Sequence, residues 1–144
     1  MDRNNTLIHL KKINFGYSGK PYLLRNLSFK LNKGDKIGII GENSCGKTTL
    51  LYIIMGLLIP DKGDLEIFGK VRRTERDFYE IRKRIGFLFQ NSDDQLFCST
   101  VEEEIAFGSL NFRVNRDEVR KIVEDKLKVV GLEGFEKRTP YNLS

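Results

Sequence analysis

The residues best placed for chemistry form one short segment, residues 41–48, with the sequence GENSCGKT. Gly41 and Gly46 lack a Cβ, so the backbone between them can take unusual dihedral angles and approach a ligand closely. The amides of such a loop, at the start of a helix, form a nest for an anion. Lys47 is expected to reach the β- and γ-phosphates of a nucleotide, and the Thr48 hydroxyl to ligate Mg²⁺. The segment therefore predicts a binding site for the phosphates of a nucleoside triphosphate.

A glycine-rich turn between a strand and a helix is the alternative interpretation of this segment. It accounts for Gly41 and Gly46 but leaves Lys47 as an unpaired cation at the positive end of a helix, which is unfavourable. A bound anion would remove this conflict, so we expect phosphate binding. The residues expected to bind the nucleotide in this loop are Gly41, Glu42, Asn43, Ser44, Cys45, Gly46, Lys47, Thr48 and Thr49.

The loop needs a strand before it and a helix after it, and the sequence has a pattern for each. Residues 36–40 contain a nearly continuous apolar run, which predicts a strand buried on both faces in a parallel sheet. Residues 48–58 (TTLLYIIMGLL) are apolar nearly all round, which predicts a buried helix.

Other elements can be predicted on both sides of the loop. Residues 7–17 and 23–31 form two short apolar–polar runs separated by a turn signal, which predicts an antiparallel sheet. Residues 65–68 and 85–89 are candidate strands, and residues 75–84 form an amphipathic helix pattern.

Two further helices carry start signals. Thr100 with Glu103, and Asn115 with Glu118, match the capping-box spacing. Gly131 is placed to end the second of these helices.

The composition is that of an ordinary globular domain, with 144 residues, 40% hydrophobic and 31% charged. The net charge of +5 could favour an anionic partner. However, the basic residues are interleaved with acidic and apolar ones, so we expect no nucleic-acid partner. Cys45 and Cys98 form no metal or disulfide pattern, and the longest apolar stretch, residues 50–59, is too short to span a membrane. These features favour a cytoplasmic protein without a signal peptide.

The segments after the loop distinguish between families that share it. Residues 87–97 (FLFQNSDDQLF) and 100–108 (TVEEEIAFG) resemble the ATP-binding cassette (ABC) ATPases, and within them the cobalt and energy-coupling-factor (ECF) importer ATPases. The resemblance runs from Leu7 to Ser144. It implies an α/β fold with a P-loop NTPase core, an N-terminal antiparallel β-subdomain and the start of a helical subdomain, truncated. The implied regions within a partial domain, 1–144, are an antiparallel β region (1–35), a P-loop core (36–90), and the Q-loop and helical subdomain (91–144).

The resemblance also assigns roles to two residues outside the loop. A tyrosine placed like Tyr17 stacks on adenine in that family, although here it could simply cap a strand. A glutamine placed like Gln90 contacts Mg²⁺ and the attacking water, although here it could be an exposed amide. The resemblance thus implies ATP and Mg²⁺ as cofactors, Lys47 and Gln90 as catalytic residues, and Thr48 and Gln90 as Mg²⁺ ligands.

Partners follow from the same resemblance. It implies a transmembrane transporter subunit, a second ATP-binding subunit, identical or different, and a peripheral location on the cytoplasmic face of the cell membrane. Only Leu143 and Ser144 match the LSGGQ signature, no apolar strand ending in Asp-Glu follows Gln90, and the one histidine is His9. We therefore expect the longer parent protein to be an ATPase that drives transport of a metal ion or vitamin. Residues 1–144 alone are expected to be inactive.

Two alternatives stay open. The first is a non-catalytic nucleotide-binding or interaction module that engages a partner through residues 90–97. The second is a soluble phosphate-loop kinase or GTPase, which would need a base-reading element such as NKxD that the sequence lacks.

Within the loop, two residues depart from the commonest family pattern. Ser44 stands where glycine is common, and if the backbone there has a positive φ, its Cβ costs about 1 kcal/mol or more. Cys45 lies at the predicted helix start, where a thiol pKa can fall, so it is expected to be the more reactive of the two cysteines.

Overall fold

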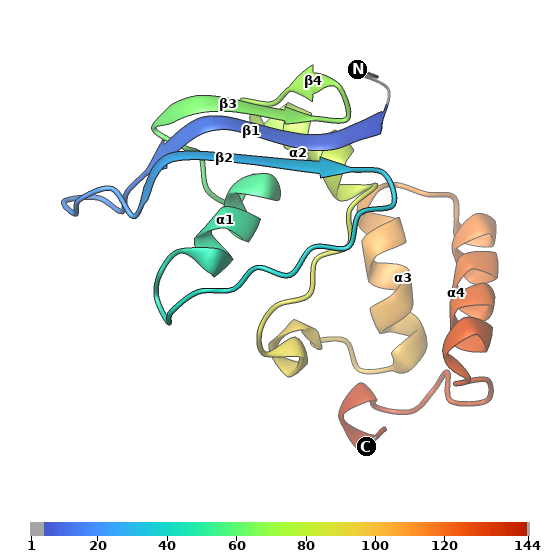
Figure 1. Cartoon of the computed structure of the whole chain (residues 1–144). Coiled ribbons are helices and arrows are strands. Elements are labelled where there is room, and N and C mark those ends of the chain that lie inside the picture. The colour runs from blue at the N-terminus through green and yellow to red at the C-terminus, as the bar shows by residue number, and fades with distance from the viewer. Residues whose placement is uncertain (1–4, 144) are drawn as a thin grey trace. The chain divides into compact units, whose positions relative to one another are not determined.

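The computed structural model describes residues 5–143, and the chain divides into two compact units, Met1–Gly86 and Phe87–Ser144 (Figure 1). The elements of the first unit are β1 (Thr6–Phe15), β2 (Leu24–Asn32), α1 (Lys47–Ile54), β3 (Lys62–Ile67), β4 (Lys70–Val71) and α2 (Glu75–Arg82). Those of the second unit are the 3₁₀ helices η2 (Ser92–Gln95) and η3 (Pro140–Asn142) and the helices α3 (Val101–Asn111) and α4 (Arg116–Val130).

The first unit is built on a four-stranded sheet with the strand order β2-β1-β3-β4, in which every neighbouring pair is antiparallel. Alternation explains β1, because Ile8 and Leu10 point inward and are buried while His9 between them is only partly buried. The predicted antiparallel pair at the N-terminus is confirmed. The predicted strand at residues 65–68 is present as β3, and it joins the same sheet.

The core of this unit lies between the sheet and its helices, and Figure 1 shows α1 below the sheet. Ile53 on α1 and Ile81 on α2 have no exposed surface, like Leu10 and Ile13 on β1. Burying a side chain of this size contributes about 1.5–3 kcal/mol. The buried set is Ile8, Leu10, Ile13, Phe15, Leu24, Leu50, Ile53, Ile54, Leu65, Ile67, Phe78 and Ile81.

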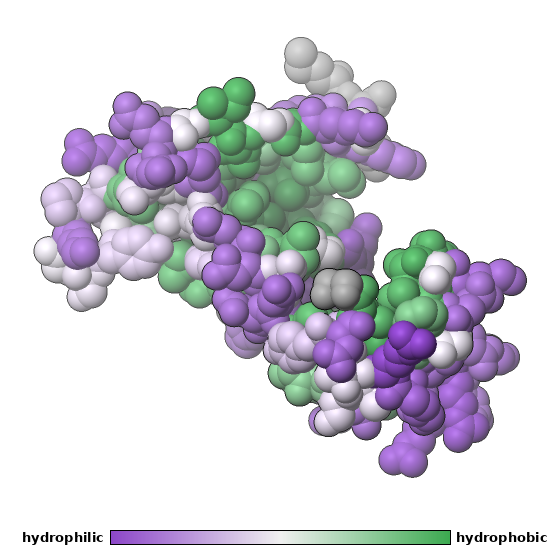
Figure 2. Space-filling model, turned by 90° about the horizontal axis from the view of Figure 1, so that it is seen from below, coloured by the Kyte–Doolittle hydropathy of each residue, from purple (hydrophilic) through white to green (hydrophobic). Residues whose placement is uncertain are grey.

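The prediction of a buried strand at residues 36–40 is wrong. This segment belongs to no strand, and Ile37, Ile39 and Ile40 are 47%, 38% and 97% exposed. A strand is buried on both faces only where neighbouring strands and covering layers surround it. Among the described residues, the paired strands are β1 to β4, and none of them pairs with this segment. Apolar side chains gather on the face of the first unit that is seen in Figure 2.

The prediction of a strand at residues 85–89 is also wrong, for a related reason. The backbone of this segment is hydrogen-bonded by a side-chain amide instead of by a neighbouring strand. The Phe89 N–H donates to Gln95 Oε1 (3.0 Å), and Gln95 Nε2 donates to the Phe87 carbonyl (3.4 Å). Leu88, between them, is 74% exposed.

The helix after the loop is shorter and less buried than predicted. It ends at Ile54 rather than at Leu58, because Gly56 takes a left-handed conformation with φ of 67° and turns the chain. Leu51 and Leu57 are 39% and 49% exposed, so the apolar run is covered on one side only.

The helix predicted at residues 75–84 is confirmed as α2. Thr74 begins it with a capping box in which the Asp77 side chain accepts from the Thr74 N–H (2.9 Å). Hydrogen bonds from the backbone N–H groups of Arg73 and Thr74, and from the Thr74 hydroxyl, lower the pKa of Asp77 to about 2. The carboxylate is therefore ionised wherever the protein is folded at neutral pH.

The capping box at Thr100 and Glu103 is confirmed, and α3 runs from there to Asn111. At α4 the cap is simpler than predicted, because Asn115 Oδ1 accepts from the Asp117 N–H (2.8 Å) and Glu118 closes no box. Gly131 ends α4 with φ of 69°, as predicted.

We expect Gly56→Ala to destabilise the first unit strongly. Its φ is positive and a Cβ would lie 2.1 Å from Cγ of Phe78, a side chain only 1% exposed. The backbone strain and the overpacking together should lower the free energy of unfolding by about 3 kcal/mol, measured by urea unfolding followed by circular dichroism.

Gly69→Ala is the matched control, because Gly69 has φ of 75° and no atom within 4 Å of the Cβ position. Backbone strain alone should then cost about 1 kcal/mol. Equal losses in the two variants would contradict the contact between Gly56 and Phe78.

Candidate nucleotide-binding site

The phosphate loop turns into α1 at Gly46, and glycine is required there for two reasons. Its φ of 102° is left-handed, and a Cβ would lie 2.7 Å from Cδ2 of Leu24. Gly41 has a different constraint, because a Cβ there would lie 2.7 Å from Sγ of Cys45. The loop can therefore lie close to both the sheet and its own side chains, as its motif predicts.

Ser44 has φ of 62°. Its backbone is therefore in the left-handed conformation in which a Cβ was expected to be costly. A serine held there stores about 1–3 kcal/mol of backbone strain. Ser44 also lines the pocket described below, so its Cβ lies at the surface that a ligand would contact.

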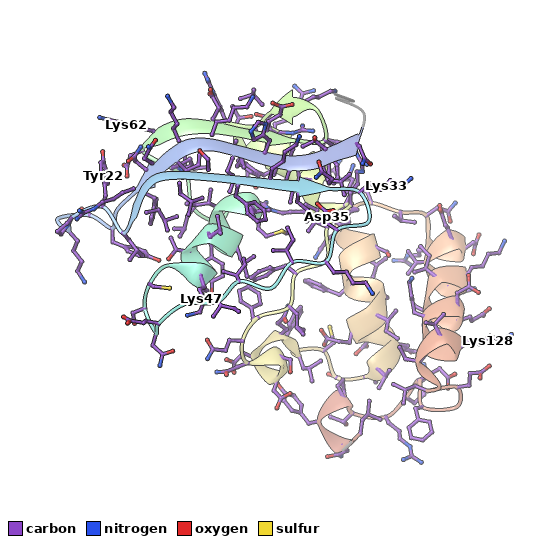
Figure 3. The ribbon with its side chains drawn as sticks, in the orientation of Figure 1. Tyr22, Lys33, Asp35, Lys47, Lys62 and Lys128 are labelled. Carbon is purple, nitrogen blue, oxygen red and sulfur yellow. The ribbon has the colours of Figure 1, made fainter. Side chains whose placement is uncertain are left out.

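Lys47 is not the unpaired cation that the sequence suggested. Its Nζ donates to the carbonyl oxygens of Gly41 (2.8 Å) and Glu42 (2.6 Å), and lies 3.8 Å from Sγ of Cys45. The ammonium thereby joins the two ends of the loop at the start of α1 (Figure 3). An anion is therefore not needed to provide Lys47 with hydrogen-bond partners. Its place beside the loop is nevertheless the one that a phosphate ligand would need.

A pocket of about 260 Å³ lies against the loop. In this pocket Tyr17, which was predicted to stack on adenine, lies with five residues of the loop. These follow Tyr17 by about thirty positions in the sequence. The Tyr17 hydroxyl is 3.1 Å from Oγ1 of Thr49, and its side chain is 44% exposed with the ring edge-on to Phe15. The residues that line the pocket are Tyr17, Leu23, Ser44, Gly46, Lys47, Thr48 and Thr49.

Sequence reasoning missed Leu23. Leu23 directly precedes β2 and lines the pocket. The apolar run that contains it predicted only a strand. Of the predicted loop residues, Gly41, Glu42, Asn43 and Cys45 do not line this pocket, although Gly41 and Glu42 hold Lys47.

The residues present fit a magnesium nucleotide. Mg²⁺ is usually held by one or two protein oxygens together with phosphate oxygens, and the Thr48 hydroxyl lies in the pocket. Among residues 5–143 there is no cluster of three or more His, Cys, Asp and Glu side chains that could hold a metal without a nucleotide.

Gln90 lies in an exposed bend of the second unit, after the segment that forms no strand. Its expected contact with Mg²⁺ stays a prediction.

The second unit has an open pocket of about 770 Å³ that is mainly apolar. Phe97 is 61% exposed and packs edge-on against Phe107, with ring centroids 4.5 Å apart. Glu104 Oε2 accepts from the N–H groups of Phe97 (3.1 Å) and Cys98 (2.8 Å), which ties this segment to α3. Asp93 and Asp94 add acidic groups to the lining.

The sequence of the chain is similar to one protein family over residues of both units. The family model described as "ABC transporter" matches residues 24–144. The chain belongs to the ABC transporter family. Its α/β fold, with an antiparallel sheet and helices, agrees with this membership.

The chain is also similar to individual proteins with known names. The chain is 40% identical, over 96% of its length, to the energy-coupling factor transporter ATP-binding protein EcfA of Methanocaldococcus jannaschii, and covers 50% of that protein. It is 42% identical to EcfA2 of Methanospirillum hungatei, of which it covers 35%. The solved structure of CbiO1 from Clostridium perfringens, part of the ABC transporter complex CbiONQ, matches with a TM-score of 0.84 and 29% identity. That match covers 97% of this chain and 56% of CbiO1.

The chain thus spans about half the length of EcfA from Methanocaldococcus jannaschii and of CbiO1. Within residues 5–143, no helix has both the length and the apolar character needed to cross a membrane.

Replacing Ser44 by glycine should tighten nucleotide binding. The change removes the Cβ from the pocket lining, so the loop backbone can approach the phosphates more closely. A gain of about 1 kcal/mol corresponds to roughly a fivefold lower Kd. The measurement is isothermal titration with MgATP. Ser44→Ala keeps the Cβ and is the control, expected to bind no more tightly than the wild type. An unchanged or weaker affinity in Ser44→Gly would contradict obstruction by the Cβ.

Cys45 should be alkylated before Cys98. Cys45 is exposed, whereas partial burial and the nearby carboxylates of Glu104 and Glu103 raise the pKa of the Cys98 thiol. Because the thiolate is the reacting form, iodoacetamide at neutral pH should label Cys45 several-fold faster, and the Cys98 rate should rise only at higher pH. Peptide mass spectrometry over a pH series measures both rates, and faster labelling of Cys98 would refute the prediction.

Proposed function

We propose that this chain is the nucleotide-binding part of an ATP-binding subunit of an importer for a metal ion or a vitamin-like micronutrient. The observation that carries the proposal is the pocket at the start of α1, where Lys47, Thr48 and Tyr17 lie together. The identity to EcfA supports the transporter role, and the likeness to CbiO1 supports an importer of the same kind.

Binding of the phosphates would use the loop as the structure has it. Lys47 Nζ would exchange the carbonyls of Gly41 and Glu42 for phosphate oxygens, a change of partner with little movement. The loop amides at the N-terminus of α1 would donate to the same phosphates. Bound Mg²⁺ would neutralise charge on the β- and γ-phosphates, with Thr48 as its protein ligand.

The base and sugar would lie toward Tyr17. Its partly exposed ring offers a stacking surface, and the hydrogen bond to Thr49 orients the phenol relative to the loop. This arrangement supports stacking on an adenine ring and provides no group that reads guanine.

We infer that residues 1–144 by themselves bind ATP without hydrolysing it. No aspartate or glutamate lines the pocket, so no described group there can orient an attacking water as a base. In the longer protein, Gln90 and the residues of a second ATP-binding subunit would complete the site, and hydrolysis would drive transport.

We propose that the open pocket of the second unit receives the transmembrane subunit, which places the protein on the cytoplasmic face of the membrane. Its apolar side chains, such as Phe97, and its acidic residues Asp93 and Asp94 match an amphipathic segment that carries arginine or lysine. The same surface supports the second candidate function, a module that binds a partner without catalysis.

The test of nucleotide binding compares Lys47→Ala with the wild-type chain. Loss of the ammonium should weaken MgATP binding by tenfold or more, since charge-assisted hydrogen bonds contribute about 1.5–3 kcal/mol each. Lys128→Ala, on α4 of the second unit, removes the same charge from a residue that does not line the pocket and should bind as the wild type does (Figure 3).

Two further measurements separate the candidates. Phosphate release from MgATP should stay at background in the wild-type chain, and a rate that Lys47→Ala abolishes would overturn the inference of binding without hydrolysis. If MgATP does not bind but a basic amphipathic peptide does, and Phe97→Ala removes that binding, the interaction module is the better description.

A further inference from the structure

The outer face of the sheet carries a site that is rich in lysine, in addition to the nucleotide pocket. A hollow of about 660 Å³ is lined there by residues of β1, β2 and β3, including Lys12, Asn26 and Lys62. These side chains are exposed, whereas Ile13 and Leu65 on the same strands are buried in the core. The hollow is thus on the opposite face of the sheet from the core, and Figure 3 labels Lys62 at the sheet and Lys47 below it.

A β-bulge in β1 creates this hollow. Lys11 and Lys12 are both exposed although they are consecutive, and the register of β1 shifts here against both β2 and β3. Strict alternation would turn one of the two lysines into the core. The bulge keeps both on the outer face, which is the known use of bulges to redirect side chains.

The backbone around the hollow is strained on both neighbouring strands. Lys12 has φ of 52° and Asn26 has φ of 49°, and lysine has none of the tolerance that asparagine has for this region. On the third strand, a Cβ at Gly63 would lie 2.6 Å from the carbonyl oxygens of Lys11 and Lys12. The shape of the hollow therefore requires an unusual conformation on each of three strands.

Hydrogen bonds hold this shape without any ligand. The Lys12 N–H donates to Oγ of Ser28 (3.1 Å), and Asn14 Nδ2 donates to the Lys12 carbonyl (3.0 Å). The Asn26 N–H donates to Oδ1 of Asn14 (3.0 Å). Asn14 thereby joins β1 to β2 across the bulge, so the hollow is organised in advance.

The charges in the hollow leave an excess of cations. Asp64 is the one carboxylate among the residues that line the hollow, and it pairs with Arg73 (3.0 Å), while Lys11 pairs with Glu66 (3.0 Å). No ion pair links Lys12 or Lys62 to any carboxylate in the described part of the chain.

We propose that this hollow binds a phosphate-bearing anion, either a free phosphomonoester or the headgroup of a phospholipid. Lys12 and Lys62 would supply the charge, and the side chains of Asn26 and Ser28 would supply uncharged donors. The site is separate from the nucleotide pocket, which lies at the start of α1. It does not depend on the function proposed for that pocket.

The test uses the full chain and amide shifts in NMR spectra. Inorganic phosphate and glycerol phosphate should shift the amides of Lys12, Asn26 and Gly63 in a saturable way. MgATP at the phosphate loop would instead shift the amide of Gly46, so failure at one site is visible separately from failure at the other. The double variant Lys12→Gln/Lys62→Gln should weaken phosphate binding by about thirtyfold, at roughly 1 kcal/mol per lysine.

The matched control is Lys33→Gln/Lys128→Gln, which removes the same charge from exposed positions outside the hollow. It should bind as the wild type does, and Lys12→Arg/Lys62→Arg should retain binding. Equal loss in the control double variant, or no shift at the three hollow amides, would overturn the proposal.

A sedimentation assay distinguishes the sources of the phosphate group. It compares vesicles of phosphatidylcholine mixed with phosphatidic acid against vesicles of phosphatidylcholine alone. Binding that needs both phosphatidic acid and the hollow lysines assigns a lipid headgroup. Amide shifts with soluble phosphate, without vesicle binding, assign a free phosphomonoester.

Discussion

The contact of Gly46 with the sheet is the constraint on which the candidate site depends. At this residue the chain turns from an extended loop into α1, with φ of 102° and with space for no atom larger than hydrogen beside Leu24. Leu50 and Ile53, one and two turns further along α1, then enter the core under β1. The same packing that anchors the helix therefore holds its positive N-terminal end at the pocket.

Charge in the first unit is handled in two ways. At the loop, the Lys47 ammonium is hydrogen-bonded to the backbone carbonyls of Gly41 and Glu42. In the hollow on the outer face of the sheet, Lys12 is held outside by a strained bulge. In both places backbone groups decide where a lysine lies, through carbonyl acceptors at Lys47 and through the positive φ at Lys12.

The exposed apolar segments have one physical cause. Residues 36–40 and 85–89 have the composition of buried strands, but burial of a strand needs hydrogen-bond partners and covering layers from elsewhere in a chain. Where the described residues offer none, the segment forms no strand and side chains such as those of Ile40 and Leu88 stay exposed. Relatives about twice as long as this chain have room for such partners.

What the sequence determined by itself is local or carried by motif. The capping box at Thr100 and the stop at Gly131 each depend on residues within a few positions, and family membership followed from short segments after the loop. The pairing of distant segments decided the rest. An apolar run predicts a buried strand but cannot report whether its neighbours are present, which is why residues 36–40 misled.

Only the tertiary structure could bring Tyr17 to Thr49, place Leu23 in the pocket and give Lys47 its carbonyl partners. The bulge at Lys12 was equally invisible in the sequence, because it arises from the register between three strands. Local hydrogen bonds are set by neighbours along the chain, whereas registers and pockets are set by packing between residues far apart in it.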